Sequence, residues 1–285
     1  MIDKRDGFYR LIVADIDGTL VTSDRRIPVA VADAVRRAQS RGVRVCLATG
    51  RIWRSAQPYV RAMGADPPVI LYNGGLVYDF VRDEVLRRVP LDPQHAALAL
   101  GLLQRFPRVR PHLYVDDRVL VDRRDEVTQA YERKDGLRVE EVGDLLPFAA
   151  EQPMKILIIG PRDALVEVDR AIASLRVPVQ AVFSEQTYLE ILPFGSSKGT
   201  ALATVADRLG VPLEETIAVG DNFNDLTMIE AAGLGVAMGN APAELRERAD
   251  FVTASNDEGG LREVIERFVL RPLSQTRTEG PRNPG

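Results

Sequence analysis

The feature that most constrains this chain is an apolar run that ends in two carboxylates. The run from Leu11 to Ala14 is short and rich in Ile and Val, and Asp15 and Asp17 follow it. Such a run predicts a strand buried on both faces, as in a parallel α/β sheet. Ligands bind beyond the carboxyl ends of such strands, so the acidic pair is well placed for function. An Asp-Gly step is also ordinary turn chemistry, so the pair by itself leaves a plain turn open.

The rest of the chain predicts further buried strands that alternate with helices. After Ile27-Pro28, apolar residues recur at helical spacing up to Gly42, which predicts an amphipathic helix. The other predicted elements are strands at 43–48, 69–72, 216–219 and 235–238, a helix from Lys198 to Gly210, and a helix containing Met228. Strand, helix and strand in this order form a right-handed parallel unit. We therefore expect a Rossmann-like α/β core whose parallel sheet has helices on both faces.

The middle of the chain predicts a second, smaller α/β domain inserted into the first. It contains strand-like runs at 113–115, 119–121 and 155–159 and helical runs at 95–103 and 164–175, and Asp116-Asp117 resembles a hairpin turn. Few polar motifs stand at the ends of these strands. We expect a discontinuous core of residues 1–83 and 186–271, an insert at 84–185, and a disordered tail at 272–285.

Composition and charge exclude several partners. The 285 residues are 45% hydrophobic and carry a net charge of -4, from 37 basic and 41 acidic side chains. Without an excess of positive charge, neither nucleic acid nor a membrane is indicated. Cys46 is expected to be a buried, inert thiol, and no signal peptide is seen, so we expect a cytoplasmic protein. His95 and His112 lie in the insert without metal-like partners and are expected to be ordinary surface or cap residues.

Four polar clusters are predicted to meet at one edge of the core sheet. They are Asp15/Asp17, Thr49-Gly50, Lys198 before a helix, and Asp221/Asp225. Singly, each has a plain explanation as a turn, a helix cap, a solvated lysine or acids in a first helical turn. Together they supply carboxylates for a hard cation, and a hydroxyl, amides and an ammonium for a phosphate. The combination indicates Mg²⁺-dependent phosphoryl transfer in which a carboxylate attacks phosphorus.

In their order along the chain, these motifs resemble the four motifs of the haloacid dehalogenase superfamily, and most closely those of its Cof-like phosphatases. The matching segments are Asp15-Ile16-Asp17-Gly18-Thr19, Thr49-Gly50-Arg51, Ser196-Ser197-Lys198-Gly199 and Gly220-Asp221-Asn222-Phe223-Asn224-Asp225, followed by Met228. Further pieces similar to that subfamily are Leu189-Glu190-Ile191 with Pro193, and Val236-Ala237-Met238-Gly239-Asn240-Ala241. The resemblance implies a haloacid-dehalogenase-like core with an inserted α/β cap domain, in which the insert selects the substrate.

The resemblance also implies a catalytic role for several residues. Asp15 would be the nucleophile, and Asp17 the general acid that protonates the leaving alcohol and later activates water. Thr49, with the amide of Gly50, would hold the phosphoryl oxygens. Lys198 would fix both Asp15 and the phosphate. The implied reaction is hydrolysis of a small phosphate monoester, such as a sugar phosphate, through an aspartyl-phosphate.

The resemblance implies a Mg²⁺ site next to the nucleophile. Asp15, the backbone carbonyl of Asp17, and Asp221 would hold the ion, with Asp225 close by or acting through water. Three further residues match positions near the site: Arg51, Asn73 and Asn224 are candidates for substrate or phosphate contact.

Two other functions stay open at this point. A phosphomutase or phosphotransferase of the same superfamily would use a second substrate hydroxyl in place of water. A phospho-aspartate signalling module would share the strand-end acids, a Thr and a Lys around Mg²⁺, but such domains are shorter and need no acid at the position of Asp17.

Overall fold

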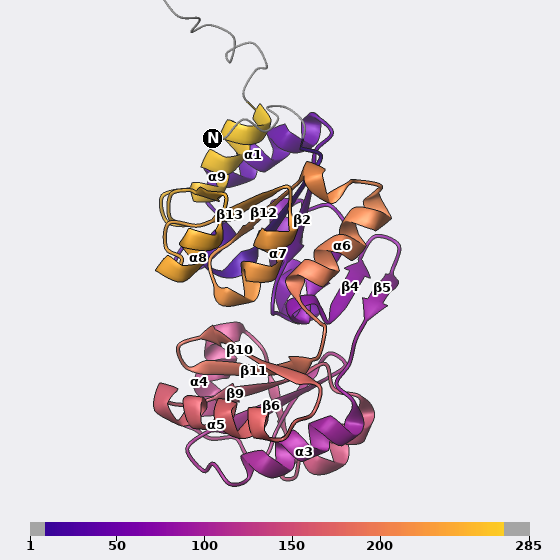
Figure 1. The fold of residues 1–285 in the computed structure, drawn as a ribbon, viewed down its shortest axis with the longest axis vertical. Helices are drawn as coiled ribbons and strands as arrows, with labels where there is room; N and C mark the ends of the chain where they lie inside the picture. Colours follow the sequence, from indigo (N-terminus) through magenta and orange to yellow (C-terminus); the bar gives the residue numbers. More distant parts are fainter. Residues whose placement is uncertain (1–8, 271–285) are drawn as a thin grey trace, which may run out of the picture.

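The computed structural model describes residues 9–270, and the expected tail at 272–285 lies outside the described residues. An eight-stranded sheet in the order β14-β13-β12-β1-β2-β3-β4-β5 forms the first unit (Figure 1). Its strands are β1 (Leu11–Asp15), β2 (Arg44–Ala48), β3 (Val69–Leu71), β4 (Leu76–Asp79), β5 (Glu84–Arg88), β12 (Thr216–Gly220), β13 (Leu234–Ala237) and β14 (Phe251–Val252). The strand β1 is central and runs parallel to both β2 and β12, as the sequence predicts. The strand β4 pairs antiparallel with both β3 and β5, and the other pairs of this described sheet are parallel.

Helices cover both faces of the first sheet, which confirms the predicted α/β architecture. The helices α1 (Val29–Ser40), α2 (Trp53–Met63) and α9 (Gly260–Ile265) pack on one face, and α6 (Lys198–Leu209) and α7 (Leu226–Ala231) on the other, with α8 (Ala243–Arg248) against α7. Side chains alternate along β1 because the strand period is two, so Ile12 joins the first helical layer and Val13 the second. Burial on both faces explains why this strand is apolar throughout.

A six-stranded sheet in the order β10-β11-β9-β6-β7-β8 forms the second unit. Its strands are β6 (Arg110–Val115), β7 (Arg118–Val121), β8 (Val139–Glu141), β9 (Lys155–Ile159), β10 (Val179–Glu185) and β11 (Tyr188–Pro193). Two helices, α3 (Pro93–Leu103) and α5 (Arg162–Ser174), pack on one face, and α4 (Glu126–Asp135) lies beside the other. The predicted hairpin turn at Asp116-Asp117 connects β6 to β7, and Asp116 adopts a φ of 50° there. Short helical turns complete the chain at Ile16–Leu20, Tyr72–Gly74, Leu146–Glu151, Leu213–Glu215, Phe223–Asp225 and Glu266–Leu270.

Two strands belong to a different sheet from the one that the predicted domain boundaries at residues 84 and 185 would give them. The strand β5 lies in the first sheet because it forms an antiparallel hairpin with β4. The strand β11 lies in the second sheet because it pairs with both β9 and β10. We therefore propose that the chain crosses between the two units after Arg88 and after Pro193.

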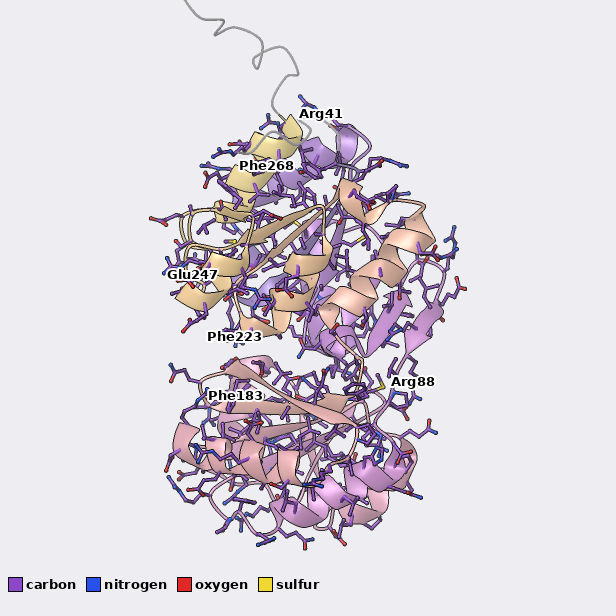
Figure 2. The ribbon with its side chains drawn as sticks, viewed as in Figure 1. Arg41, Arg88, Phe183, Phe223, Glu247 and Phe268 are labelled. Atoms are coloured by element: carbon purple, nitrogen blue, oxygen red, sulfur yellow. The ribbon has the colours of Figure 1, made fainter. Side chains whose placement is uncertain are left out.

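The two units meet along a junction formed by side chains from both. The Tyr72 hydroxyl donates to the Asp116 carbonyl oxygen at 2.6 Å, and the Asn222 amide donates to the Ser184 carbonyl oxygen at 2.6 Å. Figure 2 shows Arg88 beside this junction. Among residues 9–270, no helix is both long and apolar enough to cross a membrane.

Candidate active site

Lys198 joins Asp15, at the end of β1, to Asp225, in the helical turn that follows β12. It is the first residue of α6, and its ammonium nitrogen lies 2.6 Å from Asp15 Oδ1 and 2.5 Å from Asp225 Oδ1. The Lys198 side chain is completely buried, so these carboxylates replace the water that its charge loses. Burial alone would lower the pKa of Lys198, but the two carboxylates outweigh it and raise the pKa above its ordinary value. The predicted contact between Lys198 and Asp15 is therefore present.

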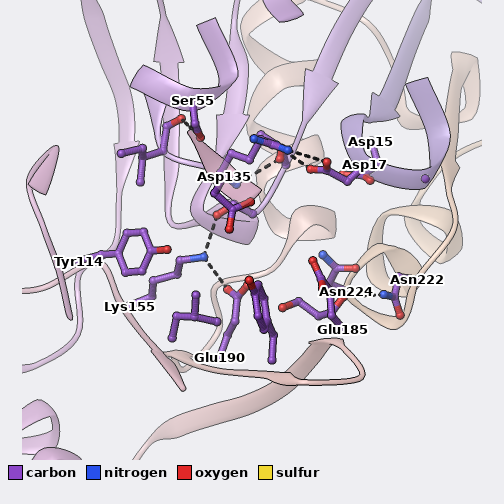
Figure 3. Close-up of a pocket in the computed structure, with 18 of the residues that line it drawn as sticks. Asp15, Asp17, Ser55, Tyr114, Asp135, Lys155, Glu185, Glu190, Asn222 and Asn224 are labelled. Carbon is purple, nitrogen blue, oxygen red and sulfur yellow. Dashed lines mark hydrogen bonds and ion pairs between the residues drawn. The ribbon is translucent and has the colours of Figure 1, made fainter. Parts of the chain in front are cut away.

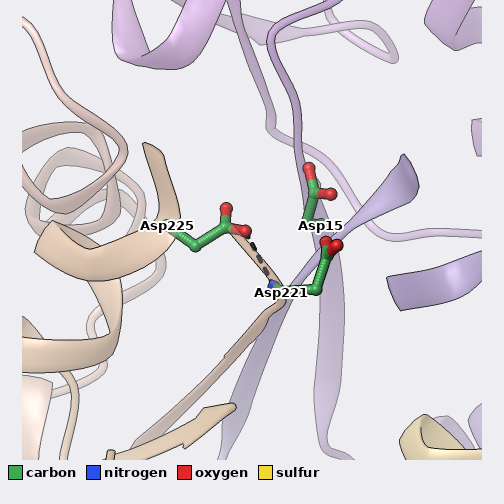
Figure 4. A group of neighbouring side chains, drawn as sticks. All are labelled: Asp15, Asp221 and Asp225. Carbon is green, nitrogen blue, oxygen red and sulfur yellow. Dashed lines mark hydrogen bonds between the residues drawn. The ribbon is translucent and has the colours of Figure 1, made fainter. Parts of the chain in front are cut away.

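Three carboxylates crowd around one point beside Lys198. Asp15, Asp221 and Asp225 each offer an oxygen atom, and these atoms lie within 4.8 Å of one another (Figure 4). Burial, together with the charge of Asp225, raises the pKa of Asp221 to about 7. Burial also raises the pKa of Asp15, against the opposing effect of Lys198. One ammonium does not balance three carboxylates, so this donor set of hard oxygens fits a divalent cation such as Mg²⁺.

Asp225 is already engaged through both carboxylate oxygens. Its Oδ1 accepts from Lys198, and its Oδ2 accepts from the backbone N–H groups of Asp221 and Asn222 at 2.9 and 3.1 Å. Asp225 therefore fixes the loop that presents Asp221.

Two side chains without a predicted role orient Asp221. The Thr19 hydroxyl donates to Asp221 Oδ1 at 3.2 Å, and the Asn240 amide donates to Asp221 Oδ2 at 3.3 Å and to the Gly18 carbonyl oxygen at 2.9 Å. Gly18 has a φ of +76°, and a Cβ there would lie 2.2 Å from Asp221 Oδ2. Thr19 and Asn240 stand inside recognisable motifs, but only the folded chain shows what they contact.

Arg51 holds Asp17 through both carboxylate oxygens. Its Nε and Nη2 atoms donate to Asp17 Oδ2 and Oδ1 at 2.7 and 2.6 Å. The Arg51 side chain is 9% exposed and that of Asp17 46% exposed. Burial by itself would raise the pKa of Asp17, but the Arg51 guanidinium outweighs it and holds the pKa below its ordinary value. Arg51, which the sequence predicts as a substrate or phosphate contact, therefore binds Asp17 here and keeps it ionised.

The Thr49-Gly50 loop follows β2 and is held by hydrogen bonds from neighbouring backbone N–H groups. Thr49 is 1% exposed, and its Oγ1 accepts from the Arg51 N–H at 3.1 Å. The backbone N–H of Asn73 donates to the Thr49 carbonyl oxygen at 3.0 Å. Because Oγ1 is used as an acceptor, the Thr49 hydroxyl hydrogen remains available for a phosphoryl oxygen.

A chain of polar contacts joins the two predicted asparagines to the second unit. Asn224 Nδ2 donates to Asn73 Oδ1 at 3.0 Å, and Asn73 Nδ2 donates to Glu190 Oε2 at 2.8 Å. Lys155 Nζ donates to the same Glu190 oxygen at 3.0 Å and to the Gly50 carbonyl oxygen at 2.9 Å. Asn73 thus contacts other protein groups here, and Lys155 and Glu190 are site residues that the sequence reasoning missed. The sequence signal that could have identified them is the presence of one charged residue in each of the buried strands β9 and β11.

A cavity of about 290 Å³ lies between the units and is lined by most of the predicted site residues, while Lys198, Asn73 and Asp225 lie behind its walls. The first unit contributes Asp15, Asp17, Thr49, Gly50, Arg51, Asp221 and Asn224 to its walls, and the second contributes Tyr114, Tyr131, Asp135, Lys155, Glu185, Tyr188 and Glu190 (Figure 3). Burial raises the pKa of Asp135, against the opposing effects of Lys134 and Arg51. The cavity therefore has the anionic cluster at one end and a mixed polar and aromatic wall at the other.

His112 and Cys46 lie outside the site, and the sequence predicts a surface or cap position for the first and burial for the second. His112 is completely buried in β6 rather than at the surface, and burial lowers its pKa to about 4. Its ring packs against Tyr131 with 4.7 Å between the ring centroids, which explains its burial in the sheet. Cys46 is buried as expected, and burial raises its pKa.

Comparisons with known proteins identify the class to which this site belongs. The family profile of haloacid dehalogenase-like hydrolases matches residues 12–265. The putative phosphatase YxeH of Bacillus subtilis is 33% identical over 271 residues, covering 92% of this chain and 99% of that protein. The pyridoxal phosphate phosphatase YbhA of Escherichia coli is 28% identical, covering 92% and 99% of the two chains. The crystal structure of a haloacid dehalogenase-like hydrolase from Bacteroides thetaiotaomicron superposes with a TM-score of 0.81 at 30% identity, covering 91% and 99%.

The chain belongs to the haloacid dehalogenase-like hydrolases. Within that class it is one of the Cof-like phosphatases, and it is a phosphoric monoester hydrolase.

Proposed function

We propose that this enzyme is a Mg²⁺-dependent phosphatase that hydrolyses small phosphate monoesters through an aspartyl-phosphate at Asp15. The observation that carries the proposal is the buried Lys198 bridge between Asp15 and Asp225, in which the ammonium lies next to the proposed nucleophile. The Asp15 carboxylate and the phosphate ester are both anions, so their reaction needs such charge compensation.

In the first step, an Asp15 carboxylate oxygen attacks phosphorus while the bond from phosphorus to the leaving oxygen breaks. This step requires the protonated form of Asp17, which gives its proton to the leaving alkoxide, so it draws on the minor form of a carboxyl group whose ionised form Arg51 stabilises. The Thr49 hydroxyl, the Gly50 amide and Lys198 bind the phosphoryl oxygens and stabilise the charge that they carry.

In the second step, Asp17 accepts a proton from a water molecule that attacks phosphorus and releases phosphate from Asp15. Arg51 stabilises the ionised form of Asp17, which is the form this step requires. The residues that would hold the ion are Asp15, Asp221 and the Asp17 backbone carbonyl, with Asp225 close by, and Mg²⁺ bound there would neutralise the carboxylates and polarise the phosphoryl group.

For the leaving group we propose a sugar or a similar hydroxyl-bearing metabolite. On the side of the second unit, the cavity is lined by the carboxyl groups of Asp135, Glu185 and Glu190, which can accept hydrogen bonds from hydroxyl groups. Among the described residues that line this wall, the cation Lys155 is paired with Glu190, so its charge is not free to bind a second phosphate. We propose that the second unit acts as a cap that excludes water and selects the leaving group. The proposed cellular setting is the cytoplasm.

The direct test is release of inorganic phosphate by the purified protein with Mg²⁺, first from an aryl phosphate and then from a panel of sugar phosphates, nucleotides and cofactor phosphates. We expect release from the aryl phosphate, loss with EDTA or Asp15→Asn, and the highest kcat/KM for a monophosphorylated sugar. Activity that resists EDTA and Asp15→Asn would overturn the mechanism. Transfer of the phosphoryl group to a second hydroxyl without release would instead indicate a phosphotransferase.

A further inference from the structure

Lys155 belongs to the second unit but touches the phosphate-binding loop of the first. It is the first residue of β9 and is 3% exposed. Its ammonium lies 2.9 Å from the Gly50 carbonyl oxygen, 3.0 Å from Glu190 Oε2 and 4.6 Å from the centre of the Tyr114 ring (Figure 3). All of these partners are protein groups, so the donors of this ammonium are directed at the protein.

The second sheet holds these groups rigidly on one face. Tyr114 of β6 stands directly opposite Lys155, and Glu190 of β11 stands opposite Leu157, two residues along β9. Because side chains alternate along a strand, all of them point towards the first unit, while Ile156 and Ile158 pack into the core on the opposite face.

The contact with Gly50 fixes the peptide group between Gly50 and Arg51 at both ends. Its carbonyl oxygen accepts from Lys155, and its N–H donates to Thr49 Oγ1 at 3.1 Å. A cation on the carbonyl oxygen polarises the peptide and strengthens its N–H as a donor. The Thr49 oxygen is then held as an acceptor, which turns its hydrogen towards the cavity.

Glu190 fixes the same loop from a second side. It accepts from Asn73 Nδ2 at 2.8 Å, and the Asn73 backbone N–H donates to the Thr49 carbonyl oxygen at 3.0 Å. Lys155 and Glu190 form one buried pair that reaches both sides of Thr49-Gly50.

We propose that Lys155, held by Glu190, is a positioning residue that completes the phosphate-binding loop from the cap side, so that the hydrogen bonds of the loop are complete only when the cap is closed. The proposal rests on the proposed phosphatase function. In this proposal, Lys155 acts on the bound phosphoryl group through the loop. Its effect is therefore the same for every substrate, and it does not act on the leaving group.

The test compares three variants with the wild-type protein. Lys155→Met removes the ammonium and keeps the length of the side chain. Lys155→Met/Glu190→Gln removes the pair without leaving a buried charge, and so keeps the test valid where the single variant is unstable. Asp117→Asn is the control, because Asp117 forms another contact between the units, with Arg54 at 3.4 Å, that does not involve the loop. For each variant, kcat and KM are measured with an aryl phosphate and a sugar phosphate, together with competitive inhibition by inorganic phosphate.

We expect kcat to fall about 10- to 100-fold for both substrates and the inhibition constant of phosphate to rise roughly tenfold in both Lys155 variants, but not in Asp117→Asn. Loss confined to the sugar phosphate, with unchanged inhibition by inorganic phosphate, would overturn the proposal because it would make Lys155 a leaving-group contact. Hydrogen exchange at residues 49–52 separates this proposal from the proposed function, because it needs no turnover. Faster exchange in the Lys155 variants supports the positioning role, and unchanged exchange contradicts it, whether or not the wild-type protein releases phosphate.

Discussion

Arg51 binds both carboxylate oxygens of Asp17, at 2.6 and 2.7 Å, across 34 residues of sequence. In such a bidentate pair the guanidinium stabilises the carboxylate form. Arg51 therefore sets the pH range in which Asp17 can accept a proton.

The first prediction concerns Arg51→Gln, which removes this charge. Burial then acts on Asp17 without the opposing guanidinium, so the pKa of Asp17 rises. The second step needs ionised Asp17, so its rate should begin to fall at a higher pH as the solution is acidified. Rapid-quench measurement of phosphoenzyme breakdown against pH checks this. An acidic limb at the same pH in both proteins would show that Arg51 does not control Asp17.

The second prediction concerns Lys198→Met, which leaves Asp15 and Asp225 buried without their cation. We expect the free energy of unfolding at neutral pH to fall by about 3–5 kcal/mol, as when one partner of a buried ion pair is removed. Arg108→Gln is the control, because its pair with Asp163 is 57% and 64% exposed. That change should have little effect on the free energy of unfolding, because exposed ion pairs contribute little to stability. Equal losses in urea titrations of the two variants would contradict the importance of the buried bridge.

The third prediction uses two glycines with similar backbone angles. Gly18 and Gly42 have φ of +76° and +83°, but a Cβ at Gly18 meets Asp221 Oδ2 at 2.2 Å whereas one at Gly42 meets nothing within 4 Å. Alanine at either position should destabilise the fold by about 1 kcal/mol through backbone strain. Only Gly18→Ala should also displace Asp221 and weaken Mg²⁺ activation of phosphate release, by about tenfold or more. Similar Mg²⁺ dependence in both variants would refute the close approach at Gly18.

The fourth prediction concerns the pH dependence of stability through His112. Burial lowers its pKa to about 4, against an ordinary value of 6.5. Between these values the unfolded chain binds a proton that the folded chain does not, so stability falls as the pH drops from 6.5 to 4. The full contribution, present above pH 6.5, is about 3 kcal/mol. Denaturant titrations of wild type and His112→Phe across this range should show a flatter curve for the variant, and parallel curves would contradict the assignment.

The sequence predicts much of the first unit because its strands are buried on both faces. Apolar runs such as the one before Asp15 therefore stand out, and the polar residues that follow them mark the edge where ligands bind. The boundary near β5 was harder to predict, since this strand is charged and largely exposed and has no apolar run. Its membership of the first sheet comes only from pairing with β4.

The site was predictable where a residue stands at a strand end or a helix start. Lys198 and Asp221 are of this kind. Lys155 and Glu190 are not, because their roles depend on which face of the second sheet is turned towards Gly50 and Asn73. Local periodicity assigns side chains to a face of a strand, but it does not say what that face meets.

The fifth prediction concerns Asp17→Asn. It should slow both formation and breakdown of the phosphoenzyme, because Asp17 is the proposed proton carrier in each step. Metal binding should be largely kept, since the proposed ligand from this residue is its backbone carbonyl. Calorimetric titration with Mg²⁺ and single-turnover kinetics measure the two effects. A variant that lost metal binding would overturn this assignment.

The most direct test of the account is to trap the phosphoryl group during turnover. The enzyme is mixed with substrate and Mg²⁺, quenched in acid within milliseconds, reduced with borohydride and examined by peptide mass spectrometry. Reduction converts an aspartyl-phosphate to homoserine, so we predict homoserine at position 15 in the wild-type protein and none in Asp15→Asn. Phosphate release with unmodified Asp15, or a phosphoryl group trapped on another residue, would contradict nucleophilic attack by Asp15.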